Sequence, residues 1–324
     1  MPTANPPARP PFDPELAAVL TVLAEQLPPS LTPAMIEPMR TASITPPIEE
    51  ILALHPDVIH REETIAGHEG AEIVVSIFAS GAPTGPAPGF FHTHGGGMII
   101  GDRFTGIEVV LDWVERFTGV CVSVDYRLAP EFPDPYPVED CYAALVWTAE
   151  HAAELGIDPD RLLIVGASAG GGLAAGTTLL ARDRQGPKLA GQVLIYPMID
   201  DRNDTVSAHQ IDGVGVCDRT SNDPGWDALL GDRRGRDDVS IYAVPARATD
   251  LSGLPPAFID VGTAEVFRDE DVAYASAIWA SGGVAELHVW PGGFHGFDLM
   301  APQAAVSQAM TAARTAWVGR LLGR

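Results

Sequence analysis

The stretch from Leu162 to Gly176 reads LLIVGASAGGGLAAG and places a single serine, Ser168, among glycines and alanines. Residues 166–170 match G-x-S-x-G, the pattern of a nucleophilic serine held on a sharp turn between a strand and a helix. Small residues on either side of such a serine keep the turn clear of its neighbours. An apolar run precedes the motif and a helix-compatible run follows it, so we predict that Ser168 is a nucleophile.

Two other interpretations of this stretch stay open. Gly170, Gly172 and Ala175 also spell G-x-G-x-x-A, a fingerprint with which NAD(P)-dependent oxidoreductases bind dinucleotide phosphates. That fingerprint expects an acid about 20 residues further on, whereas the next predicted strand reaches its acid only at Asp200. The third interpretation is a close crossing of a strand and a helix with nothing bound.

A serine hydroxyl becomes a good nucleophile when an imidazole accepts its proton and a carboxylate orients that imidazole. His295 follows the last predicted strand and is flanked by Gly293 and Gly296 in a turn. It also comes after the serine in the chain, as a base that follows the final strand would. His288 lies inside the strand and is more consistent with packing. We therefore predict that His295 is the general base.

The carboxylate partner belongs to a group of acids in and after the predicted strand at 256–262. Asp260 is within that strand, while Asp269, Glu270 and Asp271 begin the next helix, where acids complement the helix dipole. Glu265 lies in the loop between them and is the predicted triad acid. The residues alone leave Asp269 as the alternative.

Acyl transfer also needs N–H donors for the negative oxygen of the tetrahedral intermediate. His94-Gly95-Gly96-Gly97 follows an apolar strand and matches the HGGG-type loop, the companion of the amide after the nucleophile, here Ala169. His92 and His94 also form H-x-H, which on a strand places both rings on one face and suits a metal ion. No convincing further ligands accompany them, so we predict no metal ion and no cofactor.

These residues need a scaffold that brings them together. Apolar runs without polar alternation predict strands buried on both faces of a parallel sheet, and helical patterns separate several of them. Such alternation predicts a single doubly wound α/β domain, interrupted by a polar insertion at 200–254. Strands are predicted at 71–80, 88–95, 120–126, 161–168, 189–198, 256–262 and 285–292, and helices at 13–27, 105–119 and 137–156.

The composition excludes several classes of partner. With 20 basic and 43 acidic residues the net charge is −23, which disfavours nucleic acid and anionic lipid surfaces. No apolar run approaches the roughly 18 residues of a membrane span, and the N-terminus lacks a secretory signal pattern. The three cysteines are scattered, which favours reduced thiols in a cytoplasmic protein.

Six short motifs occur in the order found in one enzyme family: HGGG at 94–97, VDYRLAPE at 124–131, GASAGG at 166–171, IYPM at 195–198, FRDE at 267–270 and HGF at 295–297. Over roughly residues 70–300 the chain resembles the hormone-sensitive-lipase-like branch of the α/β-hydrolases, the bacterial class IV esterases. The resemblance implies an α/β-hydrolase fold with a mostly parallel eight-stranded sheet flanked by helices. Residues 46–199 and 255–324 are then the catalytic core, and residues 1–45 and 200–254 contribute to a helical cap.

The resemblance implies a serine carboxylesterase that cleaves short- to medium-chain esters or lactones through an acyl-enzyme intermediate. A small-molecule substrate is its expected partner, a homodimer is compatible with it, and a non-catalytic ligand-binding member is the further alternative. Two positions depart from the family pattern: Ala167 replaces a frequent aspartate, and Glu265 replaces the usual triad aspartate. The implied roles are nucleophile for Ser168, base for His295, acid for Glu265, oxyanion donors for Gly96, Gly97 and Ala169, and a loop brace for His94.

Overall fold

The computed structural model describes residues 8–25, 30–42, 45–81 and 85–324. They form one eight-stranded sheet in the order β1-β2-β4-β3-β5-β6-β7-β8. β2 pairs antiparallel with β1 and β4, and all other neighbouring strands are parallel. The strands are β1 (Val58–Ala66), β2 (Glu72–Ser80), β3 (Ala87–Thr93), β4 (Val120–Asp125), β5 (Ile157–Ala167), β6 (Gly191–Ile195), β7 (Ala257–Gly262) and β8 (Ala285–Trp290).

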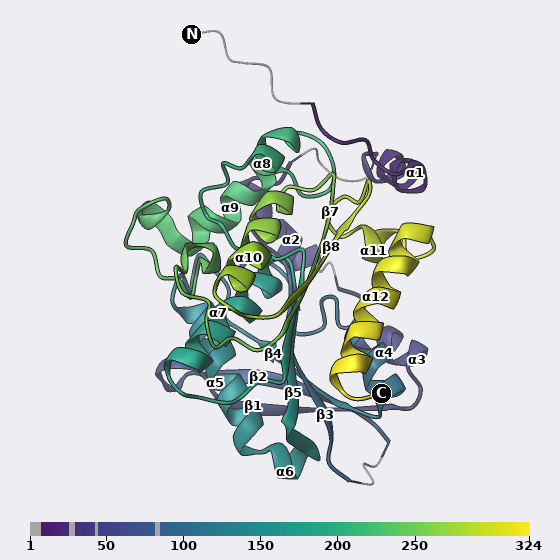
Figure 1. Ribbon diagram of the computed structural model, residues 1–324, viewed down its shortest axis with the longest axis vertical. Helices are drawn as coiled ribbons and strands as arrows, with labels where there is room; N and C mark the ends of the chain where they lie inside the picture. Colours follow the sequence, from purple (N-terminus) through teal and green to yellow (C-terminus); the bar gives the residue numbers. More distant parts are fainter. Residues whose placement is uncertain (1–7, 26–29, 43–44, 82–84) are drawn as a thin grey trace.

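Helices cover both faces of the sheet (Figure 1). α4 and α12 pack over a core on one face, and α5, α7 and α10 pack over a second core on the other. This confirms the predicted α/β-hydrolase architecture. The helices are α1 (Pro14–Leu23), α2 (Ile36–Ala42), α3 (Ile48–Leu54), α4 (Glu108–Phe117), α5 (Tyr136–Glu150), α6 (Ala152–Leu155), α7 (Ala169–Asp183), α8 (Val206–Gln210), α9 (Arg219–Leu230), α10 (Arg268–Ala280), α11 (Phe297–Met300) and α12 (Ala305–Leu321).

All seven strands predicted from apolar runs are present, and β3 to β7 lie inside the sheet, where both faces are covered. The apolar pattern did not reveal β1. It is an antiparallel edge strand in which only Val58 and Ile65 are buried, so its charged residues conceal it. The prediction of an eighth strand therefore depended on the family resemblance alone.

The polar insertion is helical. Residues 200–254 connect β6 to β7 and contain α8 and α9. The Asp218 side chain caps α9 by accepting a hydrogen bond from the Ser221 amide, and Trp226 of α9 is fully buried. Before the core, α1 begins as predicted but ends at Leu23, and residues 26–27 of the predicted helix lie outside the described residues.

The glycines after Ser168 provide close packing. A Cβ on Gly170 would lie 2.0 Å from the Thr93 carbonyl oxygen, and one on Gly172 would lie 2.1 Å from the Met198 carbonyl oxygen. Backbone fills this side of α7, which leaves no room for a dinucleotide phosphate over the glycines. The G-x-G-x-x-A overlap is thus explained by packing, and the oxidoreductase interpretation loses its structural basis.

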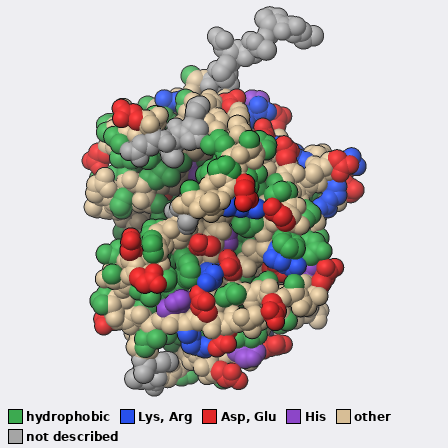
Figure 2. Space-filling model, turned by 180° about the vertical axis from the view of Figure 1, so that it is seen from behind, with side chains coloured by type: hydrophobic (Ala, Val, Ile, Leu, Met, Phe, Trp, Pro, Cys, Tyr) green, Lys and Arg blue, Asp and Glu red, His purple; other side chains and the backbone are tan. Residues whose placement is uncertain are grey.

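Acidic side chains are spread over the face of the molecule that Figure 2 shows, and basic ones are fewer, in keeping with the net charge of −23. Within the described part of the chain, no helix has the length and apolar character needed to cross a membrane.

Candidate active site

Ser168 lies on a strained turn between β5 and α7. Its φ of 58° and ψ of −124° are rare for a residue with a side chain. The Ser168 amide donates to the Ile195 carbonyl at 2.9 Å, which ties the turn to the neighbouring strand. A Cβ on Gly166 would lie 2.2 Å from the Gly170 carbonyl oxygen, so the turn requires glycine there. The expected steric reason for the small residues is confirmed.

His295 connects the serine to a buried acid. Its Nε2 lies 3.0 Å from the Ser168 Oγ, and its Nδ1 lies 2.6 Å from the Glu265 Oε1. Glu265 is fully buried, and its second oxygen accepts a hydrogen bond from the Phe267 amide at 2.8 Å. Burial raises the pKa of the Glu265 carboxyl, while the hydrogen bond with His295 opposes that rise. The three side chains form one continuous chain of hydrogen bonds.

The other candidate acids and His288 lie elsewhere. Asp269 accepts a hydrogen bond from the Ser207 amide at 2.7 Å and pairs with Arg268, so its carboxylate is engaged away from His295. Asp260 forms an ion pair with Arg314. His288 is in β8 and contacts Glu286, as its position within a strand suggested.

The loop after β3 presents free N–H groups near the serine. Gly96 and Gly97 have φ values of 115° and 62°, and within the described residues their amides donate to no other group. His94 is buried, stacks on Tyr126 with ring centroids 4.0 Å apart, and donates from Nδ1 to the Gly95 carbonyl at 2.8 Å. Gly96 and Gly97 line the same cavity as Ser168, and the stacked His94 imidazole supports their loop.

The H-x-H pair does not form a metal site. His92 is buried with its Nδ1 2.8 Å from the Ser123 Oγ, and burial lowers the pKa of His92 to about 3. In the described part of the chain, one group has metal-ligand types in reach of one another: His55, Asp112 and Glu115. His55 follows the end of α3, the two acids are on α4, and the group does not include Ser168, His295 or Glu265.

A cavity of about 1550 Å³ is lined by Ser168, His295 and the glycines of the loop after β3, Gly95, Gly96 and Gly97. Ala167, where many family members have aspartate, also lines it. Its wall includes residues before the core and residues from the insertion: Leu31, Met35, Met39, Val216, Cys217, Ser221, Asn222 and Gly225. Gly225 of α9 packs so tightly on this glycine loop that a Cβ would lie 2.5 Å from the Gly97 carbonyl oxygen. The insertion therefore contacts the loop directly.

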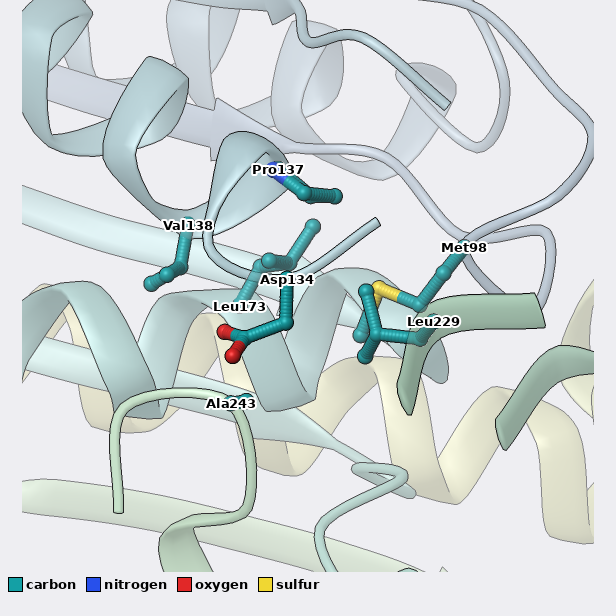
Figure 3. Close-up of a pocket in the computed structure, with 7 residues that line it drawn as sticks. All are labelled: Met98, Asp134, Pro137, Val138, Leu173, Leu229 and Ala243. Carbon is teal, nitrogen blue, oxygen red and sulfur yellow. The ribbon is translucent and has the colours of Figure 1, made fainter. Parts of the chain in front are cut away.

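A second cavity of about 10 Å³ lies between α5, α7 and the end of α9 (Figure 3). Asp134 points into it among apolar side chains that include Leu173 and Leu229. A space of this size holds about one water molecule. None of the candidate catalytic residues lines it, so it is not a substrate site.

Sequence reasoning assigned no role to two aromatic side chains beside His295. The rings of Tyr196 and Phe267 meet the imidazole edge-on, with centroids 4.8 Å and 5.2 Å away. Both residues belong to motifs of the family resemblance, IYPM and FRDE, which was the available signal.

Replacement of one buried acid of α10 should stabilise the protein in a pH-dependent way. Asp271 of α10 is fully buried, and neither carboxylate oxygen has a hydrogen-bond partner among the described residues. Burial raises the pKa of Asp271 well above its ordinary value, and Glu270 adds to the rise. The folded state thus retains a proton that the unfolded chain releases, so stability falls as the pH rises from the unfolded pKa toward the raised folded one.

We therefore expect Asp271→Asn to raise the melting temperature more at about pH 8 than at about pH 5, since asparagine has no proton to lose. Thermal denaturation at both pH values measures this. Asp232→Asn, at a side chain that is 89% exposed, is the control and should change neither value. An equal shift of Asp271→Asn at both pH values would contradict the prediction.

Three comparisons with known proteins agree with this geometry. The profile of the alpha/beta hydrolase fold family matches residues 90–299. The carboxylesterase NlhH of Mycobacterium tuberculosis is 35% identical over 301 residues, which cover 90% of this chain and 92% of that protein. An arylesterase of Saccharolobus solfataricus is 36% identical over 196 residues, 59% of this chain and 62% of its own.

Solved structures show the same relationship. A bacterial heroin esterase superposes with a TM-score of 0.86 at 37% identity, over 96% of this chain and 98% of its own. The esterase LipW from Mycobacterium marinum superposes with a TM-score of 0.84 at 30% identity, over 97% and 98%. The chain belongs to the α/β-hydrolase family, in its hormone-sensitive-lipase-like branch. Within that family it is a serine hydrolase of carboxylic esters.

Proposed function

We propose that Ser168, His295 and Glu265 are the catalytic triad with which this protein cleaves carboxylic esters. The observation that carries the proposal is the unbroken chain of contacts, 3.0 Å from Ser168 Oγ to His295 Nε2 and 2.6 Å from His295 Nδ1 to Glu265. In this arrangement the imidazole can accept the serine proton while a buried carboxylate fixes its tautomer and orientation.

The reaction proceeds in two halves. His295 Nε2 accepts the Ser168 proton as Oγ bonds to the ester carbonyl carbon, and the imidazolium then protonates the departing alkoxide. The acyl group remains on Ser168. A water molecule loses its proton to His295 and attacks that acyl carbon, which releases the carboxylic acid and returns the proton to Oγ. Glu265 stays ionised and stabilises the imidazolium in both halves.

The amides of Gly96, Gly97 and Ala169 are the proposed donors to the oxyanion. Positive φ values turn the two glycines, and Ala169 is the first residue of α7, whose helix dipole favours negative charge. His94 braces the loop through its bond to Gly95 and its stacking on Tyr126. No cofactor takes part in this chemistry.

The substrate is proposed to be a small ester with a short to medium acyl chain, or a lactone. Apolar side chains such as Met35, Met39 and Val216 line the cavity, which suits an uncharged organic ester. Residues 1–45 and 200–254 are proposed as the cap over the core formed by 46–199 and 255–324, because both segments contribute to that wall. The names of the relatives, carboxylesterase and arylesterase, support the same reaction.

A cytoplasmic location is also proposed. Cys121, Cys141 and Cys217 are free thiols, two of them buried, as in a reducing compartment. A homodimer is compatible with the fold, and sedimentation of the purified protein distinguishes it from a monomer.

The decisive experiment combines turnover with covalent capture. Hydrolysis of p-nitrophenyl esters of increasing chain length and of lactones defines the substrate, and a fluorescent organophosphonate should label Ser168 and stop turnover. Peptide mass spectrometry identifies the labelled residue. Labelling elsewhere, or turnover that persists after complete labelling, would overturn the assignment of the nucleophile.

A further inference from the structure

An arginine of the last helix is buried between two acids near the base. Arg314 of α12 has a side chain that is 1% exposed. Its Nε donates to the Asp260 Oδ2 at 2.7 Å, and its Nη1 donates to the Asp298 Oδ2 at 2.6 Å. Asp260 is in β7 and Asp298 is in α11, three residues after His295. A charge taken out of water in this way requires such partners, and the proposed reaction gives it no role.

Both acids also accept hydrogen bonds from Tyr196. The Tyr196 hydroxyl donates to the Asp298 Oδ1 at 3.0 Å, and the Tyr196 amide donates to the Asp260 carbonyl oxygen at 2.7 Å. The φ of Tyr196 is 35°, a strained backbone value that this double anchor maintains. Arg314, Asp260, Asp298 and Tyr196 therefore form one closed network, called here the arginine network.

Tyr196 is the member of the arginine network that contacts the base. Its ring meets the His295 imidazole with centroids 4.8 Å apart and planes at 65°. Phe267 is the second aromatic neighbour, and its ring lies at 86° to the plane of the His295 imidazole. The Phe267 amide donates a hydrogen bond to Glu265. The imidazole is thus restrained by Glu265 through a hydrogen bond and by two rings through packing.

We propose that Tyr196, Asp298 and Arg314 are positioning residues that orient the His295 ring toward Ser168. The proposal rests on the catalytic role of His295 proposed above. Arg314 fixes the Asp298 carboxylate, Asp298 fixes the Tyr196 hydroxyl, and the anchored ring limits rotation of the imidazole. A small misplacement of a catalytic group reduces the rate strongly, so loss of one link should lower kcat and leave KM nearly unchanged.

Tyr196→Phe and Asp298→Asn test this because both keep the shape of the side chain. Tyr196→Phe removes the hydroxyl that donates to Asp298, and Asp298→Asn leaves one acceptor oxygen and no charge for Tyr196 and Arg314. We expect each to lower kcat and the rate of organophosphonate labelling by about tenfold, within the range that misplacement can cause. The double variant should be no slower than the worse single one, because both changes interrupt the same chain of contacts from Arg314 to Tyr196. Arg314→Met should show the same loss.

Two matched controls separate positioning from general stability. Tyr274→Phe removes the hydroxyl of another buried tyrosine, and Arg247→Met breaks the buried Arg247–Asp201 pair in the insertion. Both should retain the wild-type labelling rate, whatever their melting temperature. The proposal is overturned if Tyr196→Phe and Asp298→Asn label as fast as these controls, or if their loss only follows the unfolded fraction seen by circular dichroism. If wild-type Ser168 itself is not labelled, the proposed function fails instead.

Discussion

Ser168→Ala is expected to reduce turnover of a p-nitrophenyl ester by on the order of 10⁵-fold or more, because no acyl-enzyme can form without the hydroxyl. The fold should survive, since alanine lacks only the Oγ that contacts His295 and retains the Cβ. The strained φ of 58° remains as it is, because alanine and serine have similar backbone restrictions. Initial rates with an active-site titration of the wild type measure the effect.

Ser221→Ala is the matched control, because Ser221 lines the same cavity and its hydroxyl bonds to Asp218 and to the Leu31 amide. It should change turnover by no more than a few-fold. If Ser168→Ala retained more than a few per cent of the wild-type rate after removal of contaminating esterase, Ser168 would not be the nucleophile.

Glu265→Gln is expected to lower kcat by about 10⁴-fold with little change in KM, by analogy with the loss of a triad carboxylate elsewhere. Glutamine has nearly the same size, so the loop geometry should persist. Its amide, however, carries no charge to stabilise the imidazolium, and its NH₂ group can force the wrong tautomer on His295. Steady-state kinetics with a soluble ester give both constants.

Asp269→Asn provides the comparison, because Asp269 accepts a hydrogen bond from the Ser207 amide and pairs with Arg268 rather than with His295. Its kcat should stay within a few-fold of the wild type. A larger loss for Asp269→Asn than for Glu265→Gln would transfer the role of the triad acid to Asp269.

The sheet could be predicted where the sequence pattern is local and strong. The central strands are continuous apolar runs because helices cover both of their faces, and each was recognised. β1 was not, since an edge strand with charged residues has the composition of a loop. α9 was not recognised either, because its buried residues, Asn222, Pro224 and Gly225 among them, carry little hydrophobic periodicity.

The residues of the candidate site were likewise predictable where a short local motif marks them. Ser168 and His295 were singled out by short motifs that follow strands, and the structure brings them within 3.0 Å of each other. Position in the loop favoured Glu265 but left Asp269 as the alternative, because both follow β7 within a few residues. In the structure Glu265 lies against His295, and Asp269 contacts Ser207 and Arg268 instead.

By itself the sequence determined the turn at Ser168 and the glycine loop at 94–97, because clearance and positive φ depend on the size of residues only a few positions apart. Only the tertiary structure decided which carboxylate meets His295 and how Arg314 joins β7 to α11. Those contacts link residues that are 30 and 54 positions apart, and their geometry follows from how the helices pack on the sheet.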